Sequence, residues 1–520
     1  MKRKVPYFAA CSFIWFMLFI TASVRAEGKD TLDCKIILLK TKGTIYQMLG
    51  EITERSGFLF IYDSNILDND QRIKLKKKEY TIREAVHAIT GQNDLKMKII
   101  GNHILLSLHQ KTDSAANVID QPLAGHKESI YFDVEGVLHD NYTQEPISYG
   151  TVGVKEAGVG TITNQNGEFR LRLPDSLLHS TIYFSHLGYK PQEINSQLLI
   201  GRHNFLTLEP QVIPIQEIVV RLVNPRKLLQ DMIDKRNINY ANHPAYLTSF
   251  YREGVEHRKK LSNLTEAIFK IYKTPYMSPH KDQVKLLKMR RISDENEKDS
   301  LIAKMKSGIN ACLLLDVIKI LPDFFMTDYN DQYNYIHSDI TVIDNRLANV
   351  ISFEQKANVK EPLYKGAIYI DAENDALLRV SFEFNPQYVK DVGNILIIKK
   401  SRDIKIIPQK VSYTVTYKPW NNTYYINHIR GDLNFKIKKR RKIFNTNTLH
   451  VWFEMATCRI DTIDVRRFTK HEILPTRSIF AETNFIYDKD FWENFNVILP
   501  EEKLNEAISK ISSKIEETGY

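Results

Sequence analysis

The stretch YFDVEGVLHDNYTQEPISYGTVGVKEAGVGTITNQNGEFRL, at residues 131–171, opens the segment around which the rest of the chain is organised. Its side chains alternate with a period of two, as Val152 and Val154 do, and this period is typical of strands with one buried face. Asn166-Gly167 is a hairpin turn sequence. Residues 130–208 are therefore expected to form about seven short strands, enough for a β-sandwich. Further strands of this set are predicted at residues 181–185 and 205–208.

One loop of this segment carries three side chains with oxygen atoms suited to a cation, Asn164, Asn166 and Glu168. A calcium loop needs a longer run of oxygen ligands at fixed spacing, and this stretch lacks that run. Gly167 after Asn166 is what a tight hairpin turn needs by itself. We favour the turn over a calcium site.

Four phrases in this segment resemble the carboxypeptidase-D regulatory-like domain. They are V-x-G-V-x-x-D from Val134, P-I-x-x-G-T-V-x-V from Pro146, G-T-I-T-N-Q-N-G-E-F-R-L from Gly160 and Y-F-S-H-L-G-Y from Tyr183. The resemblance implies a transthyretin-like accessory sandwich, without the zinc peptidase that gives the family its name. We therefore expect an adaptor module with no catalytic group.

The first 26 residues have the pattern of a signal peptide. Lys2-Arg3-Lys4 is a charged start, residues 7–22 form an apolar run, and Val24-Arg25-Ala26 offers small residues for cleavage before Glu27. The run is short for a membrane span, and an uncleaved anchor is the alternative. We expect an exported, periplasmic protein associated with the outer membrane.

Charge and cysteine content narrow the class of protein further. Four positive charges lie in the leader, which leaves +6 of the formal +10 spread along the remainder, too diffuse to indicate a nucleic-acid partner. Cys34, Cys312 and Cys458 remain, and an odd number at such wide separations is neither a disulfide framework nor a metal site. We expect buried free thiols, with one long-range disulfide as the alternative.

Residues 34–108 have the pattern of a compact α/β unit. Thr81 and Glu84 form a capping box at the start of a second helix, and Gly101-Asn102 is the turn of a closing hairpin. The first helix is predicted from an apolar stripe with helical spacing, made of Ile45, Met48, Leu49 and Ile52.

This unit, with its phrases TIYQMLGEITERSGFLFIY and YTIREAVHAITGQNDLKMKIIGNHILLS, resembles the short N-terminal (STN) domain of secretins and TonB-dependent receptors. In that family the module is a periplasmic protein-interaction domain, used in some transducers to contact an inner-membrane anti-sigma regulator. The resemblance implies a docking unit, whose protein partner would be an anti-sigma regulator or a TonB-system component.

Residues 109–129 are polar, contain Pro122 and have the composition of a linker. Within them, Asp113-Ser114-Ala115 resembles the O-glycosylation acceptor triplet of Bacteroidetes envelope proteins. We leave open whether this triplet is modified.

Residues 220–520 are predicted to form an α+β domain built on a large, curved antiparallel sheet. Asn224-Pro225 has the residues of a helix start, and a helical segment, split near Gly308, is predicted at residues 300–320. From Asp331 onward the two-residue alternation is strong, which predicts strands with one buried face. Its apolar positions include Leu378, Val380, Phe382 and Phe384; Val411, Tyr413, Val415 and Tyr417; and Leu433, Phe435 and Ile437.

Two resemblances cover this domain. The phrase GAIYIDAENDALLRVSFEF resembles the curved half-barrel of periplasmic lipoprotein carriers. The phrases NPRKLLQDMIDKRNINYANHPAYLTSFYRE, EAIFKIYKTPY, IRGDLNFKIKKRRK and FWENFNVILPEE resemble a Bacteroidetes envelope family, some members of which continue into an outer-membrane barrel. The chain instead ends in a predicted helix with Leu504, Ile508, Ile511 and Ile515 on one side, which packs on the sheet or pairs with a partner helix.

No catalytic, cofactor-binding or metal-binding residue is predicted. His471-Glu472 lacks the second histidine of a metalloprotease helix, and neither a nucleophile elbow nor a phosphate-binding loop occurs. The basic run from Lys436 to Lys442 fits a contact with anionic headgroups, or more simply the solvated end of a hairpin that guards an edge strand.

The overall fold class is therefore predicted to be multidomain α+β, mostly β. The expected function is non-enzymatic: an envelope adaptor that docks a protein partner through residues 34–108. The alternative is a periplasmic carrier that holds a lipid-like or glycan ligand on the curved sheet, and a hydrolase is the weakest reading. Association with lipid or with the outer membrane is also expected.

Overall fold

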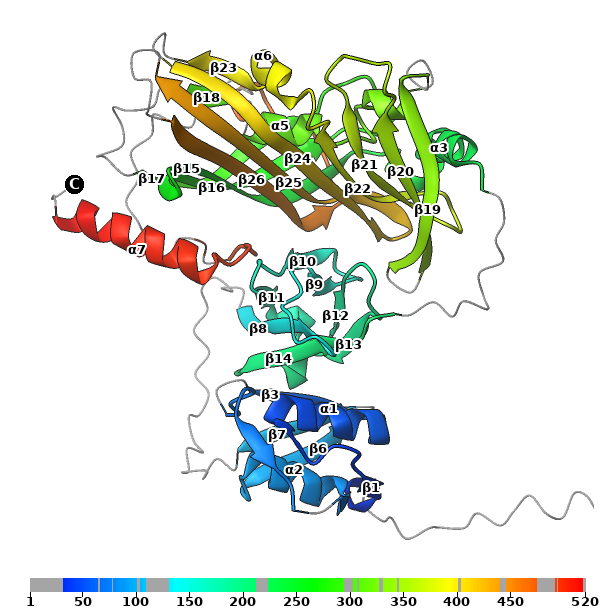
Figure 1. The fold of residues 1–520 in the computed structure, drawn as a ribbon, viewed down its shortest axis with the longest axis vertical. Helices are drawn as coiled ribbons and strands as arrows, with labels where there is room; N and C mark the ends of the chain where they lie inside the picture. The colour runs from blue at the N-terminus through cyan, green and yellow to red at the C-terminus, as the bar shows by residue number, and fades with distance from the viewer. Residues whose placement is uncertain are drawn as a thin grey trace, which may run out of the picture. The chain divides into compact units, whose positions relative to one another are not determined.

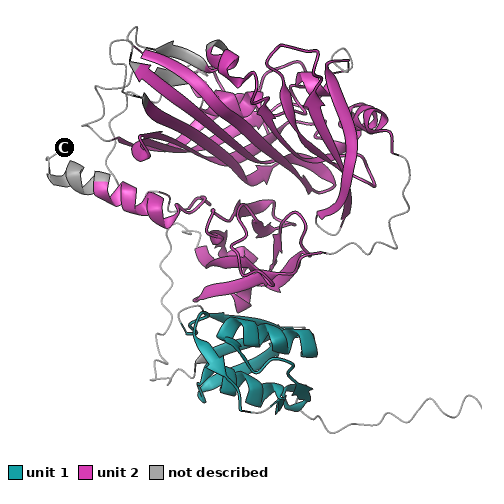
Figure 2. Ribbon diagram, in the orientation of Figure 1, with its two compact units in different colours: residues 1–116 teal, residues 117–520 magenta. Residues whose placement is uncertain are grey.

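The computed structural model describes residues 31–63, 66–76, 78–100, 103–108, 131–211, 223–293, 303–305, 308–326, 331–343, 346–400, 404–439, 446–474, 492 and 494–517. The predicted leader, the linker with its Asp113-Ser114-Ala115 triplet and part of the basic run lie outside these residues. The chain divides into two compact units, residues 1–116 and 117–520 (Figure 2). Within the described part, no helix has the length and hydropathy required to cross a membrane.

The first unit is the predicted small α/β fold. Each of its two helices starts with a capping box, at Thr44 and at Thr81, and each ends at a left-handed glycine, Gly57 or Gly91. β3 and β7 are parallel, whereas the pairs β6–β7, β1–β5 and β2–β4 are antiparallel. The elements are β1 Lys35–Ile37, β2 Lys42–Thr44, α1 Ile45–Ser56, β3 Leu59–Asp63, β4 Arg72–Lys74, β5 Glu79–Thr81, α2 Ile82–Thr90, β6 Leu95–Ile100 and β7 His103–Leu108.

The second unit begins with the predicted β-sandwich. One layer has the order β11-β8-β14 and the other the order β13-β12-β9-β10. Val134, Leu138, Phe169 and Phe184 are fully buried between them. The strands are β8 Tyr131–Asp140, β9 Thr151–Val154, β10 Val159–Ile162, β11 Glu168–Pro174, β12 Thr181–Ser185, β13 Gln192–Asn195 and β14 His203–Leu208.

The rest of the second unit is the predicted curved sheet, with strand order β17-β16-β15-β26-β25-β24-β22-β21-β20-β19 (Figure 1). All of its neighbouring strands are antiparallel. The strands are β15 Ala245–His257, β16 Lys260–Lys273, β17 Gln283–Ser293, β19 Tyr333–Ile343, β20 Arg346–Gln355, β21 Tyr364–Asp371, β22 Leu377–Phe384, β24 Ile404–Trp420, β25 Thr423–Lys439 and β26 Thr446–Asp461.

Helices and short strands flank this sheet. Asn224 caps α3, as predicted, because its side chain accepts hydrogen bonds from the backbone N–H groups of Arg226 and Lys227. The remaining elements are α3 Pro225–Asp234, α4 Arg236–Asn239, β18 Ala303–Met305, α5 Ile309–Leu314, α6 Gly393–Leu396, β23 Ile397–Lys400 and α7 Glu502–Glu517, and β18 pairs with β23.

The terminal helix packs on the sheet, which was the first of its two predicted roles. Leu504 and Ile508 of α7 are buried in a cluster with Leu264, Ile292 and Trp452 of the strands. Nothing is described of the side chains beyond Lys510. The apolar seam of the described part is therefore occupied within the chain.

Three predictions are wrong. The helical segment expected over residues 300–320 is wrong before Gly308, where residues 303–305 form β18, whereas the expected split near Gly308 is confirmed because α5 begins there. Cys34 is exposed and only Cys312 and Cys458 are buried, all three as free thiols. The basic run does lie at a hairpin end, but β25 is an interior strand between β24 and β26, so it guards no edge.

Candidate ligand-binding site

The inner face of the curved sheet is a continuous apolar surface. The two-residue alternation of β22, β24 and β25 points one side chain in two to this face, as the sequence predicts. Val380, Val415 and Leu433 are fully buried there, and Phe382 and Ile437 nearly so. Because a single sheet leaves such a face open, something else in the chain must cover it.

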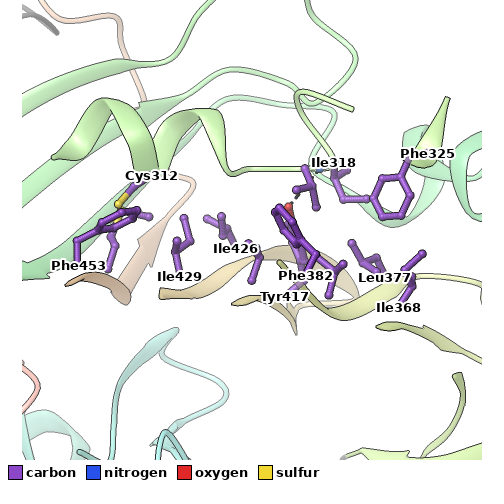
Figure 3. Close-up of a cluster of buried hydrophobic side chains, with 14 of the residues drawn as sticks. Cys312, Ile318, Phe325, Ile368, Leu377, Phe382, Tyr417, Ile426, Ile429 and Phe453 are labelled. Atoms are coloured by element: carbon purple, nitrogen blue, oxygen red, sulfur yellow. Dashed lines mark hydrogen bonds between the residues drawn. The ribbon is translucent and has the colours of Figure 1, made fainter. Parts of the chain in front are cut away.

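Residues 308–326, which we call the cover segment, occupy this face. Cys312, Ile318 and Phe324 are fully buried, and Phe325 is 3% exposed. Figure 3 shows Cys312, Ile318 and Phe325 facing side chains of the strands, among them Tyr417. The ring of Phe324 stacks on Phe353 with centroids 4.5 Å apart. The interior of the sheet is therefore a packed core, to which the cover segment contributes beside α3 and the residues around α6.

A buried ion pair fixes the cover segment to the sheet. Lys273 of β16 lies between two carboxylates, that of Asp282 at 2.7 Å and that of Asp316 on the cover segment. The hydroxyl of Tyr417 also donates to Asp316, at 2.7 Å. Burial alone would lower the pKa of Lys273, but the charges of Asp316 and Asp282 raise it above its ordinary value. The amine is therefore a charged anchor and has no free lone pair for catalysis.

Hydrogen bonds tie the same segment to its surroundings at two further points. The guanidinium of Arg236 donates to the carbonyl of Ile318 at 3.1 Å. The amine of Lys319 donates to the carbonyls of Pro275 and Ser278. These contacts hold the second half of the cover segment against α4 and the turn after β16.

Three large apolar side chains of the cover segment are exposed. Leu314 is 53% exposed, Ile320 46% and Met326 40%. The segment that packs against the inner face therefore also presents apolar side chains to solvent.

The outer face of the sheet carries a hollow of about 550 Å³ over β19, β20, β21, β22 and β24. Small side chains form its floor, among them Ser352, Ala367 and Ser381, which lie opposite one another on adjacent strands. Lys365 and Glu383 pair across its edge at 3.1 Å. Its volume lies in the range of small-molecule sites, but its lining residues already satisfy one another.

One cross-strand row runs from this hollow over the whole outer face. After Ser381 it continues to Thr414 on β24, and then the side chains become charged. The full row, in strand order, is Ile336, Ser352, Ala367, Ser381, Thr414, Arg430, Glu454, Arg252, Glu266 and Arg290.

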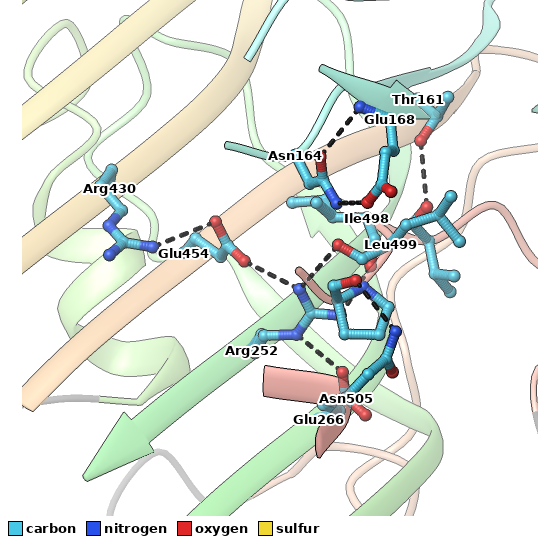
Figure 4. Close-up of polar contacts among 12 residues, drawn as sticks. Thr161, Asn164, Glu168, Arg252, Glu266, Arg430, Glu454, Ile498, Leu499 and Asn505 are labelled. Carbon is cyan, nitrogen blue, oxygen red and sulfur yellow. Dashed lines mark hydrogen bonds and ion pairs between the residues drawn. The ribbon is translucent and has the colours of Figure 1, made fainter. Parts of the chain in front are cut away.

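The charged half of this row alternates in sign and is buried (Figure 4). Arg252 pairs with Glu266 at 2.7 Å and with Glu454 at 3.3 Å, and Arg430 reaches Glu454 at 3.3 Å. Although burial alone would raise it, the charges of Arg252 and Arg290 lower the pKa of Glu266. Burial raises the pKa of Glu454, although the charges of Arg430 and Arg252 act against it. Each charge of the row has a partner, and together they form a buried ion-pair network.

Residues 494–510, the C-terminal arm, close over this network. Arg252 donates to the carbonyls of Ile498 at 2.6 Å and Leu499 at 3.4 Å. The arm also reaches the sandwich, where the side-chain amide of Asn496 exchanges hydrogen bonds with the backbone of Arg172, at 2.7 and 3.1 Å. The arm therefore joins the sandwich to the sheet.

The loop considered for calcium is a turn, as predicted. The side-chain oxygen of Asn164 accepts from the N–H groups of Asn166 and Glu168, both at 2.9 Å, and its amide donates to the Glu168 carboxylate. Gly167 has φ +76°. Among the described residues, no group of three or more metal-ligating side chains comes together.

The sequence interpretation missed both the cover segment and the charged row. The row gave no usable signal, since Arg252 and Arg290 stand in strands that carry other charged residues, such as Glu253 and Lys288. The cover segment gave none either, because its apolar residues fit a buried helix equally well.

Comparison with known proteins identifies the sandwich. Residues 134–220 match the family model of the CarboxypepD_reg-like domain, which confirms the prediction for this part of the chain. No curated protein matches the chain. The resemblance of residues 34–108 to STN domains stays a prediction.

Several solved structures are similar to part of this chain at low sequence identity. A domain assigned to outer membrane lipoprotein sorting, from Vibrio parahaemolyticus, is 10% identical, with 47% of this chain and 95% of that chain covered and a TM-score of 0.20. A LolA superfamily protein from Nitrosomonas europaea is 8% identical, with 49% and 98% covered and a TM-score of 0.17. A DUF1329 family protein from Desulfovibrio piger is 9% identical, with 47% and 96% covered and a TM-score of 0.21. Similarity at these TM-scores carries no argument about the ligand of this chain.

Proposed function

We propose that this protein is a non-enzymatic, exported carrier, which holds a lipid-like chain between the inner face of the curved sheet and the cover segment. The observation that carries the proposal is that the cover segment buries Phe324 and Ile318 against the sheet and leaves Leu314 and Ile320 exposed. In this proposal the described state is the closed, ligand-free one.

The energies of opening and of ligand binding are comparable. The cover segment buries five large apolar side chains in this core, those of Ile309, Val317, Ile318, Phe324 and Phe325. Withdrawing them costs about 1.5–3 kcal/mol each, so roughly 8–15 kcal/mol in all. An acyl chain of about 14 methylenes gains about 0.8 kcal/mol for each CH₂ that it buries, or roughly 11 kcal/mol. A long acyl chain is therefore able to replace the cover segment, and a short apolar molecule is not.

The test uses a dansyl-labelled C11 fatty acid and a labelled C16 analogue as fluorescent probes. Asp316→Asn removes the anchor of the cover segment, so we expect the C16 probe to bind about tenfold faster than to the parent chain. Asp282→Asn is the matched control, since it removes the other carboxylate of the same Lys273 but leaves the cover segment tied. Its binding rate is expected to stay within about twofold of the parent chain.

Two results would sink the carrier proposal. One is the lack of saturable binding of either probe to any variant. The other is equal acceleration by both substitutions, which would mean that the ion pair matters for folding alone. Native mass spectrometry of the protein purified from envelopes gives an independent answer, because a carrier retains a lipid of defined mass.

A second function, docking of a protein partner, is favoured by a different observation. In the first unit Ile37 is 63% exposed and Leu39 is 68% exposed, one on β1 and the other just beyond it. Two large apolar side chains at one strand end form a contact for a partner surface. Crosslinking in native envelopes, with Ile37→Ser/Leu39→Ser beside the parent chain, tests this function. Loss of a specific partner supports docking, and an unchanged set of crosslinked proteins removes the support.

A further inference from the structure

A small cavity lies where the sandwich meets the curved sheet. It has a volume of about 50 Å³. Its walls come from both parts, with Thr151, Thr161 and Tyr183 on the sandwich and Lys418 and Trp420 on the sheet. Since a single water needs about 10–15 Å³ of such space, the cavity has room for a few waters or for one small molecule.

The end of the β24–β25 hairpin holds two of these side chains in place. Asn421 and Asn422 both have positive φ, which gives the tight two-residue turn of a twisted hairpin. Trp420 then lies against Gly158 of the sandwich, where a Cβ atom would come within 2.8 Å of the indole nitrogen. The backbone carbonyl of Gly158 accepts from Ile460 at 3.0 Å. The junction is therefore fixed by backbone contacts, and the cavity walls are preformed.

Two hydrogen-bond donors in this cavity have no acceptor. The amine of Lys418 and the indole nitrogen of Trp420 are shut off from solvent, and neither has a hydrogen-bond partner within the residues that the structure describes. The Lys418 amine lies 3.7 Å from the centroid of the Tyr183 ring, so a cation–π contact replaces part of the missing hydrogen bonding. Burial and the charge of Lys155 lower the pKa of Lys418 well below its ordinary value. A buried donor without an acceptor is costly, more so when it is charged.

Nearby charges define what would satisfy these donors. The other amine close to the Tyr183 ring, that of Lys155, is already paired with Glu193 at 3.0 Å. When Lys418 takes up a proton it brings one positive charge that no described residue compensates, beside one neutral donor, and an anion bound there would raise its lowered pKa again. A monoanion with two oxygen atoms fits this pattern, and a doubly charged phosphate brings one charge too many.

We propose that this cavity is a binding site for a small carboxylate, which accepts hydrogen bonds from Lys418 Nζ and Trp420 Nε1 at the junction of the sandwich and the sheet. Bound there, the carboxylate contacts both parts and fastens them together. Its role is separate from that of the inner face, so the site exists whether or not the protein carries a lipid.

The experiment uses trifluoroacetate as a ¹⁹F NMR probe of the chain from Glu27 onward. Saturable binding is expected, displaced by acetate and not by inorganic phosphate. Lys418→Met should weaken binding by about tenfold or more, since it removes the charged donor. Trp420→Phe keeps the ring and removes one neutral hydrogen bond, so a loss of about threefold to tenfold is expected. Lys190→Met is the control, because its exposed ion pair with Glu209 lies outside the cavity lining, and binding should stay within about twofold.

A measurement of thermal stability without carboxylate guards against misfolding. Lys418→Met should melt at the same temperature as the parent chain or higher, because the buried amine without an acceptor is gone. If Lys418→Met proves unstable, Trp420→Phe decides alone. The proposal is overturned if the parent chain shows no saturable binding, if Lys418→Met binds as the parent does, or if phosphate displaces the probe more strongly than acetate. Those results would leave a cavity that holds water only.

Discussion

Arg252 and Glu266, on the adjacent strands β15 and β16, form an ion pair of 2.7 Å in which neither side chain is more than 1% exposed. The pair sits in the middle of a row of five alternating charges on the outer face of the sheet. Buried charges of this kind are costly to desolvate and are tolerated only when all are paired. The row therefore gives the sheet a fixed register, since a slip by one residue would separate every pair.

Removing Arg252 should destabilise the second unit strongly. Arg252→Met leaves Glu266 and Glu454 with one cation each and frees the carbonyls of Ile498 and Leu499, so a loss of about 3–5 kcal/mol is expected in urea unfolding. Lys365→Met is the matched control, because its ion pair with Glu383 is partly exposed, and about 1 kcal/mol or less is expected. Equal losses for the two variants would contradict a special role for the buried row.

The parts of the fold that the sequence predicts are those decided locally. The helix starts at Thr81 and Asn224 follow from side chains that satisfy nearby backbone N–H groups, and β22 and β24 follow from one buried face. The charged row could not be predicted, because Arg252 and Glu454 meet only through the strand order. The helix expected before Gly308 failed for a related reason, since residues 303–305 pair as β18 with the distant strand β23.

Stability should fall on the alkaline side because of His450. Burial alone would lower its pKa, but hydrogen bonds to Asp432 and Glu256 raise the pKa of His450 to about 9. Because this pKa is raised in the folded chain, protonated His450 contributes its full stabilisation below pH 6.5, the ordinary pKa of histidine. This stabilisation is lost as the pH rises through about 9. We expect unfolding free energy to drop by roughly 2 kcal/mol across this window.

His450→Gln isolates this effect, since glutamine bonds to the same carboxylates and does not titrate. The difference in unfolding free energy between the parent chain and this variant should shrink from pH 6.5 to 9. His337→Gln is the control, because His337 contacts Asn349 near the other edge of the sheet. This variant should lose the same amount of unfolding free energy between pH 6.5 and 9 as the parent chain does. A parent profile that stays flat across the window would contradict the assignment.

Thiol labelling should separate the three cysteines by burial. Cys34 is exposed, whereas Cys312 and Cys458 are 0% and 4% exposed. Burial raises the pKa of Cys458 to about 12, so its thiolate is scarce at neutral pH. Maleimide should label one thiol in the folded chain from Glu27 onward and three in guanidinium. Cys34→Ser should abolish the fast reaction, and rapid labelling that persists in this variant would show that the buried sites open.

Gly254 on β15 should tolerate no side chain, because the ring of Trp452 lies over it. A Cβ atom there would come within 2.4 Å of the indole carbons. The same ring faces the guanidinium of Arg430 at 4.8 Å and donates to Glu256 at 3.2 Å, so it cannot turn away without losing both contacts. Gly254→Ala is expected to cost about 1–3 kcal/mol and to change the near-UV circular dichroism of Trp452.

The opposite result is expected for the matched substitution in α1. Gly50 has nothing within 4 Å of where its Cβ atom would be, and alanine is the better helix former. Gly50→Ala should therefore stabilise the first unit by up to about 1 kcal/mol. If Gly254→Ala is as stable as the parent chain, the ring of Trp452 does not rest on β15. The Trp452 ring would then be free to move away from β15, in conflict with its contacts to Glu256 and Arg430.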